Sequence, residues 1–145
     1  MTTARDLLAR KKSAAVITVA PDATVKDAAR LMHEHRIGAL VVADGSTIRG
    51  IFTERDVLWR VVSEGRDAAT TAVRDVMTSD VIVVRPEREL DDIEGILMQH
   101  RIRHLPVAGE EGLLGMLSIG DLNAFRADAD HQAVEYLTEY IYGKS

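Results

Sequence analysis

Two short motifs in this sequence place a carboxylate three positions after a hydroxyl. They are Thr53-x-x-Asp56 and Ser118-x-x-Asp121, and each follows an apolar run. The pattern is typical of a capping box, in which side chains satisfy free amides at a helix start. The same arrangement suits a nucleoside phosphate, because a helix start attracts phosphate and a carboxylate there can accept hydrogen bonds from ribose hydroxyls. The motif alone leaves both interpretations open.

The two motifs occupy equivalent positions in a duplicated sequence. Residues 16–43 align with residues 81–108 without a gap, and Asp121 lies 65 positions after Asp56. Two copies are too few for a solenoid, so the duplication predicts two similar subdomains. We place repeat one at 4–66 and repeat two at 72–128.

Each repeat shows the same order of local patterns. In repeat one, a β-rich run at 16–19 precedes an apolar stripe at helical spacing, two further β-rich runs and a second helical pattern that begins at Thr53. The equivalent first run in repeat two is 81–84. The sequence therefore predicts an α+β fold of two β-α-β-β-α subdomains, packed pseudo-symmetrically through their sheets.

Two kinds of segment lie outside this unit. ARDLLA near the start of the chain resembles VRDVMT at 73–78, so a short helical lead-in is expected before each repeat. The tail, 129–145, carries Val134, Leu137 and Ile141 on one helical stripe. We expect an amphipathic helix there, which would cover a seam or meet a second protomer.

Composition excludes several classes of protein. The chain has no cysteine, so disulfides and thiolate zinc sites are excluded. Its net charge of −5 opposes general attraction to nucleic acid. No run of about 18 apolar residues is present that could span a bilayer. We therefore expect a cytoplasmic protein whose partners are neither nucleic acid nor a membrane.

No catalytic constellation can be assembled from residue spacing. There is no Gly-rich phosphate loop, and G-M-L-S-I-G at 115–120 has one residue too many for a nucleophile elbow. His100 and His104 are four positions apart, but a helix should end between them, which disfavours a metal pair. Trp59 stands alone and is predicted to lie in the core or in a seam. We expect neither an enzyme nor a metal site.

Several of these stretches carry a family resemblance. VITVAP and its copy VIVVRP, HRIGALVV and its copy HRIRHLPV, and the two Thr/Ser-x-x-Asp motifs resemble a tandem pair of cystathionine β-synthase (CBS) domains, the Bateman module. The resemblance covers residues 4–142 and is similar to the stand-alone bacterial kind. It implies two clefts between the repeats that bind adenosine ligands such as AMP, ADP, ATP, NAD or S-adenosylmethionine.

The resemblance also implies the residues of two sites, each read within one repeat. The site with Asp121 would contain Val81, Ile82, Val83, Arg103, His104, Leu105, Pro106, Ser118 and Asp121. The site with Asp56 would contain Val16, Ile17, Thr18, Gly38, Ala39, Leu40, Thr53, Arg55 and Asp56. Because repeat one lacks the pair Arg103-His104, we expect the site with Asp121 to bind phosphate better.

The function implied by the resemblance is a non-catalytic regulatory module. Its ligand would change the packing of the repeats or the surface of a homodimer, and an unidentified client protein could read that change. The alternative is a structural or protein-interaction dimer module without a physiological nucleotide, in which the two motifs only cap helices.

Overall fold

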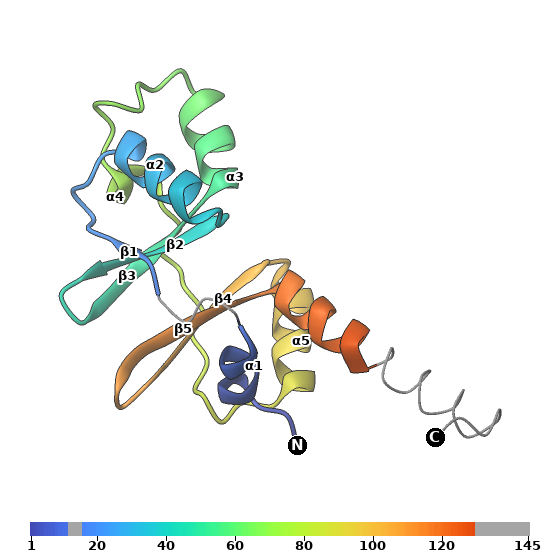
Figure 1. Ribbon diagram of the computed structural model, residues 1–145. Coiled ribbons are helices and arrows are strands. Elements are labelled where there is room, and N and C mark those ends of the chain that lie inside the picture. The colour runs from blue at the N-terminus through green and yellow to red at the C-terminus, as the bar shows by residue number, and fades with distance from the viewer. Residues whose placement is uncertain (12–15, 130–145) are drawn as a thin grey trace, which may run out of the picture.

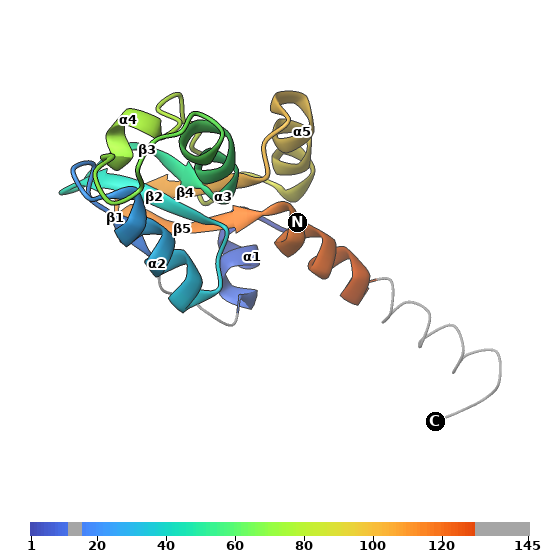
Figure 2. The same cartoon turned by 90° about the horizontal axis from the view of Figure 1, so that it is seen from above.

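The computed structural model describes residues 1–11 and 16–129, which form a mixed α+β structure with two small sheets (Figure 1). Seen from above, the sheets lie in the middle, with α1 and α2 on one side and α3 and α5 on the other (Figure 2). The predicted α+β class and the two β-α-β-β-α subdomains are confirmed. The helix predicted in the tail falls on residues 130–145, outside the described residues.

Repeat one builds a three-stranded sheet of β1 (Thr18–Val19), β2 (Ala39–Asp44) and β3 (Thr47–Thr53), with β1 parallel and β3 antiparallel to β2. Helix α2 (Val25–His35) begins at Thr24, whose hydroxyl accepts a hydrogen bond from the Asp27 amide. The short helix α3 (Glu54–Asp56) continues directly into the π-helical segment η1 (Val57–Val62). The Thr53 motif therefore lies where the last strand becomes the last helix.

Repeat two follows the same order with one difference. Helix α5 (Leu90–His100) precedes the hairpin of β4 (His104–Gly109) and β5 (Gly112–Ser118), and residues 119–129 are helical. The predicted strand at 81–84 is reduced to one parallel bridge between Val84 and Val107. The cause is Pro106, which stands where repeat one has Val41 and has no N–H to donate to the neighbouring segment.

Each helical lead-in packs on the other repeat and not on the repeat that it leads into. In α1 (Ala4–Arg10), the amide of Ala4 donates to the Arg88 carbonyl at 2.8 Å. In α4 (Val73–Val76), the amide of Val73 donates to the Ala23 carbonyl at 2.8 Å. Figure 1 shows α1 beside repeat two and α4 beside repeat one. The sequence predicted the lead-ins but not this exchange.

Equivalent glycines let the lead-ins approach the sheets closely. A Cβ atom on Gly50 of β3 would lie 2.6 Å from the Thr78 carbonyl oxygen, just after α4. A Cβ atom on Gly115 of β5 would lie 2.6 Å from a methyl carbon of Leu8 in α1. Larger residues would push each lead-in away from its sheet.

Each sheet has its own hydrophobic core, and each core takes residues from the exchanged lead-in. The first core contains Val19, Val25, Ala28, Met32, Leu40, Val42, Phe52, Val61, Val73 and Val76. The second core contains Ala4, Leu7, Val84, Leu90, Ile93, Leu97, Leu105, Val107, Leu117 and Leu122. The domain boundaries at 4–66 and 72–128 stay predictions. Side-chain packing crosses both of them, since each core contains residues from both repeats.

Candidate functional site

Two clefts lie between the repeats. The first, which we call the Asp121 cleft, has a volume of about 610 Å³. Repeat two contributes His104, Ser118 and Asp121, and repeat one faces them with residues 16–17 and 35–39. Helix α1 and the residue that follows it close a further side of this cleft with Arg5, Leu8, Ala9 and Lys11.

The second, which we call the Asp56 cleft, has a volume of about 660 Å³. Repeat one contributes residues 53–56 and the side chains of Leu58, Trp59 and Arg60. Repeat two faces them with residues 80–82 and 101–104, and Ile51 and Thr78 complete the lining. Each cleft therefore combines a Thr/Ser-x-x-Asp motif of one repeat with strand and turn residues of the other.

This arrangement corrects the predicted grouping of the candidate residues. Val16, Ile17, Gly38 and Ala39 line the Asp121 cleft rather than the Asp56 cleft. Val81, Ile82 and Arg103 line the Asp56 cleft rather than the Asp121 cleft. The physical reason is the face-to-face packing of the repeats, which turns each motif toward the opposite repeat. Because Arg103 lines the Asp56 cleft, it does not support the expectation that the Asp121 cleft binds phosphate better.

Five of the predicted site residues line neither cleft, and all five belong to the part of the chain that the structure describes. Leu40 and Leu105 are fully buried in the two cores, and Pro106 is buried in β4. Thr18 and Val83 are exposed. Thr18, Leu40, Val83 and Leu105 each directly follow a lining residue, and Pro106 stands one position further, so the lining ends before these five residues.

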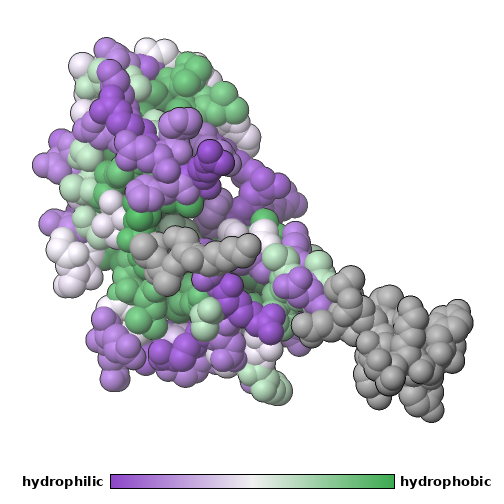
Figure 3. Space-filling view, viewed as in Figure 1, coloured by the Kyte–Doolittle hydropathy of each residue, from purple (hydrophilic) through white to green (hydrophobic). Residues whose placement is uncertain are grey.

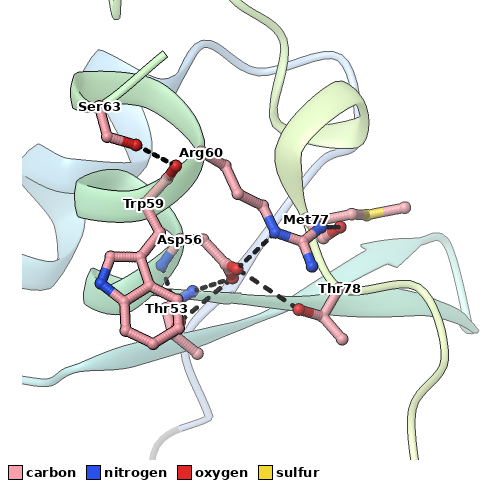
Figure 4. A network of polar contacts seen from close by, with 7 residues as sticks. All are labelled: Thr53, Asp56, Trp59, Arg60, Ser63, Met77 and Thr78. Atoms are coloured by element: carbon pink, nitrogen blue, oxygen red, sulfur yellow. Dashed lines mark hydrogen bonds and ion pairs between the residues drawn. The ribbon is translucent and has the colours of Figure 1, made fainter.

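Asp56 is held mainly by its own helix start (Figure 4). Its Oδ2 accepts hydrogen bonds from the Thr53 amide at 3.0 Å and the Thr53 hydroxyl at 3.1 Å, and its own amide donates to that hydroxyl at 3.2 Å. Its Oδ1 lies 3.4 Å from the Thr78 hydroxyl and 3.5 Å from Arg60 Nε. The motif is therefore a complete capping box, and a ribose would have to share or displace the contacts at Oδ1.

Asp121 caps its helix in the same way but is more open. Its Oδ2 accepts a hydrogen bond from the Ser118 amide at 2.8 Å, and its amide donates to the Ser118 hydroxyl at 3.1 Å. Its side chain is 25% exposed, against 7% for Asp56. Lys11 Nζ lies 3.0 Å from the same Oδ2. Sequence reasoning missed Lys11, because no local signal connects a residue to a carboxylate 110 positions later.

Of the two positions predicted for Trp59, the core or a seam, it takes the seam, because it lines a cleft between the repeats. It is 60% exposed, lines the Asp56 cleft, and stacks with Arg55, whose guanidinium carbon lies 5.0 Å from the ring centroid. Because the inner side of η1 is occupied by Val61, the indole is left on the outer side. The side chain is therefore placed to contact a molecule in this cleft.

His104 lines both clefts and stands in the wall between them. Burial lowers the pKa of its imidazole, while the nearby carboxylates of Glu54 and Asp121 act in the opposite direction. The neutral imidazole can both donate and accept hydrogen bonds. His104 is thus positioned to contact a ligand on either side.

Cationic side chains gather around both clefts although the chain is acidic. The Asp56 cleft has Arg55, Arg60, Arg101 and Arg103, and the Asp121 cleft has Arg5, Lys11 and Arg36. Figure 3 shows hydrophilic residues along the hollow between the two halves of the molecule. Local positive charge can attract an anion that the net charge would repel.

Residues 1–11 and 16–129, the part of the chain that the structure describes, contain no group of three or more His, Asp or Glu residues that could hold a metal ion. They also contain no helix with the length and apolar character needed to cross a membrane.

Comparisons with known proteins agree with the duplicated fold. A family model described as CBS domain matches residues 3–63 and 73–128. The CBS domain-containing protein YhcV of Bacillus subtilis is 36% identical over 107 residues, which are 74% of this chain and 76% of YhcV. The crystal structure of the CBS-domain containing protein ATU1752 from Agrobacterium tumefaciens has a TM-score of 0.79 and 38% identity, covering 86% of this chain and 99% of that one.

A more distant structure shares the fold. The CBS domain pair of protein MJ0100, solved in complex with 5′-methylthioadenosine and S-adenosyl-L-methionine, has a TM-score of 0.79 at 20% identity. It covers 89% of this chain and 98% of that chain. With two matching segments that account for most of its length, this chain belongs to the CBS domain family and carries a pair of CBS domains.

Proposed function

We propose that this CBS pair is a non-catalytic regulatory module that binds an adenosine-containing ligand, AMP, ADP, ATP or NAD, in the clefts between its repeats. The observation that carries the proposal is the construction of both clefts. Each joins a helix-start carboxylate from one repeat with cationic and apolar residues from the other. The complex of MJ0100, which has the same fold, supports adenosine compounds as the ligand class.

The residues suggest a role for each part of such a ligand. The carboxylates of Asp56 and Asp121 would accept hydrogen bonds from ribose hydroxyls. The apolar segments Val16–Ile17 and Val81–Ile82 would contact the base. In the Asp56 cleft, the exposed Arg101 and Arg103 would bind phosphate through charge-assisted hydrogen bonds, which contribute roughly 1.5–3 kcal/mol each.

Regulation would follow from the shared walls of the clefts. A ligand that contacts both repeats binds best to the packing in which it touches both at once. It can shift the equilibrium between two packings of the repeats only by the difference in its affinity for them. His104 would transmit occupancy of one cleft to the other, because it lines both. A client protein would then read the changed outer surface.

We include a homodimer in this proposal. Leu58, Trp59 and Val62 lie on η1 and are between 57% and 63% exposed. Hydrophobic side chains are visible over this helix in Figure 3. An exposed apolar cluster on one helix is typical of an interaction surface. A second copy of this chain, set side by side with the first, would cover it.

The rival function is a structural or protein-interaction module without a nucleotide. One observation favours it: the Asp56 side chain is buried, and its carboxylate is already satisfied by the cap, Thr78 and Arg60. In that case the motifs would contribute only to helix stability.

A calorimetric titration of the folded protein with AMP, ATP and NAD separates the two functions. Because Trp59 is the only tryptophan in the sequence and lines the Asp56 cleft, its fluorescence reports on that cleft during the same titration. We expect heat on binding and a rise in melting temperature, since a ligand specific for the folded state stabilises it. No heat at millimolar ligand would exclude the binding function.

A pair of variants tests the role of the motif. Asp121→Ala removes a cap and a proposed ribose contact, whereas Thr24→Ala removes only the cap at the start of α2, and Thr24 lines neither cleft. Each should lower stability by about 1 kcal/mol. Only Asp121→Ala should also reduce the heat of nucleotide binding. If both variants bind nucleotide as the wild type does, Asp121 is a cap alone.

A further inference from the structure

Lys11 forms an ion pair with the Asp121 carboxylate in the Asp121 cleft. It is the C-cap residue that directly follows α1, and its Nζ lies 3.0 Å from Asp121 Oδ2 and donates a hydrogen bond to the Met116 carbonyl at 2.7 Å. The side chains of Lys11 and Asp121 are 30% and 25% exposed, so this ion pair is partly withdrawn from water. The ammonium therefore stands at the oxygen that a ribose would approach.

The equivalent carboxylate in the other cleft is held differently. Asp56 pairs with Arg60, which is four residues along the same helical segment, and with the Thr78 hydroxyl. Lys11 instead comes from the exchanged lead-in. It carries three donors on a flexible four-carbon stem, so it can turn to another anion within the cleft more easily than a planar guanidinium fixed on the same helix.

A ligand whose ribose binds the Asp121 carboxylate would displace the ammonium of Lys11, which would then need another anion as its partner. An uncharged nucleoside has no anion to offer, so its ribose would compete with the ammonium and leave that charge unpaired in a partly buried cleft. A nucleotide brings a phosphate with it. Once the ribose hydroxyls bind Asp121, Nζ can pair with this phosphate, and the same cleft has Arg5 and Arg36 in its lining.

We propose that Lys11 is the specificity-determining residue of the Asp121 cleft and makes it select phosphorylated nucleosides over uncharged ones. This inference rests on the proposed function. It predicts opposite effects of Lys11 on two ligands that share the same base and sugar.

The test compares AMP with adenosine by calorimetry in wild type and in Lys11→Met, which keeps the stem and removes the charge. We expect AMP to bind about tenfold more weakly to the variant, the loss of one charge-assisted contact. Adenosine should bind severalfold more tightly, because its ribose no longer competes with an ammonium. Lys11→Arg should keep the preference for AMP.

Two controls assign the effect to this residue and this cleft. Lys26→Met removes an exposed lysine of α2 that lines neither cleft, and should leave both affinities unchanged. Repeating the titrations with Asp56→Asn in the background weakens the other cleft, so the remaining heat comes from the Asp121 cleft. Melting curves of every variant confirm that it is folded.

Each result decides the inference. If Lys11→Met lowers the affinities for AMP and adenosine equally, Lys11 only shapes the cleft. If both affinities are unchanged, the ion pair with Asp121 has no role in selecting the ligand. Both results overturn the inference and leave the proposed function intact. If the wild type binds neither AMP nor adenosine, the inference fails, and the titrations with ATP and NAD then decide whether the proposed function fails as well.

Discussion

Asp56 and Asp121 are equivalent in the repeat but have different surroundings. Both accept a hydrogen bond from the backbone amide of the hydroxyl residue that starts their helix. The carboxylate of Asp56 is then closed by Arg60 and Thr78, whereas that of Asp121 meets Lys11 and is more exposed. A helix cap is thus the shared role, and access for a ligand depends on the neighbours that the fold supplies.

His104 gives a pH-dependent prediction at the same scale. Burial lowers its pKa in the folded protein, so below its ordinary value of about 6.5 the unfolded chain binds the proton more readily. Stability should therefore fall as the pH drops from about 6.5 toward the lowered folded pKa, and this group should contribute no slope above that window.

The measurement is urea unfolding at several pH values through this window, in wild type and in His104→Gln. The variant should lose less stability toward acid than the wild type does. His33→Gln, at an exposed position of α2, is the matched control. An identical decline in wild type and His104→Gln would show that another group causes it.

Among the helices and strands, the lead-ins depend most on tertiary contact. Helices α1 and α4 are far shorter than the length of about 12–15 residues at which an isolated helix becomes even marginally stable. Their apolar residues are buried instead in the core of the opposite repeat, as Leu7 and Val76 show. The lead-ins therefore fold as parts of the sheets that they cover.

The close contact at Gly50 yields a stability prediction. A Cβ atom there would meet the Thr78 carbonyl oxygen at 2.6 Å, and backbone cannot yield as a side-chain end can. Gly50→Ala should lower the free energy of unfolding by about 1–3 kcal/mol. Gly95→Ala is the matched control: it lies within α5 with open space around it, and should raise stability by about 0.5–1 kcal/mol. Urea unfolding measures both, and a Gly50→Ala variant as stable as wild type would contradict the close approach.

At the scale of the whole molecule, the two repeats are interwoven. The exchanged lead-ins connect each core to both halves of the sequence, and both clefts lie where the repeats meet. Under the proposed function, a ligand in either cleft would contact parts of the chain that belong to different cores. It would in this way act on the relative packing of the repeats.

The proposed homodimer is tested at this scale by sedimentation. Val62→Lys places a charge in the exposed cluster on η1 but lies outside both clefts. If a second copy covers this surface, the charge would be buried, and the dimer should dissociate at concentrations at least tenfold higher than for wild type. Val83→Lys, exposed elsewhere, should behave as wild type does. A dimer unaffected by Val62→Lys would place the interface elsewhere.

Local patterns predicted most of the fold and the parts of the site. The α+β class, the order of helices and strands within a repeat, and the capping boxes at Thr53 and Ser118 were all readable from the sequence. They depend on interactions between residues close in the chain, such as the period of apolar residues and hydrogen bonds across three positions. The exception was the strand at 81–84, which Pro106 shortens through a contact between distant segments.

The sequence by itself determined that this chain is a duplicated CBS pair with a carboxylate at an equivalent helix start in each repeat. Only the tertiary structure decided which residues face those carboxylates: Arg103 belongs with Asp56, and Lys11 with Asp121. The physical reason is the similarity of the two copies. Pairing within a repeat and pairing across repeats satisfy the same local patterns equally well, and only the packing of one sheet against the other distinguishes them.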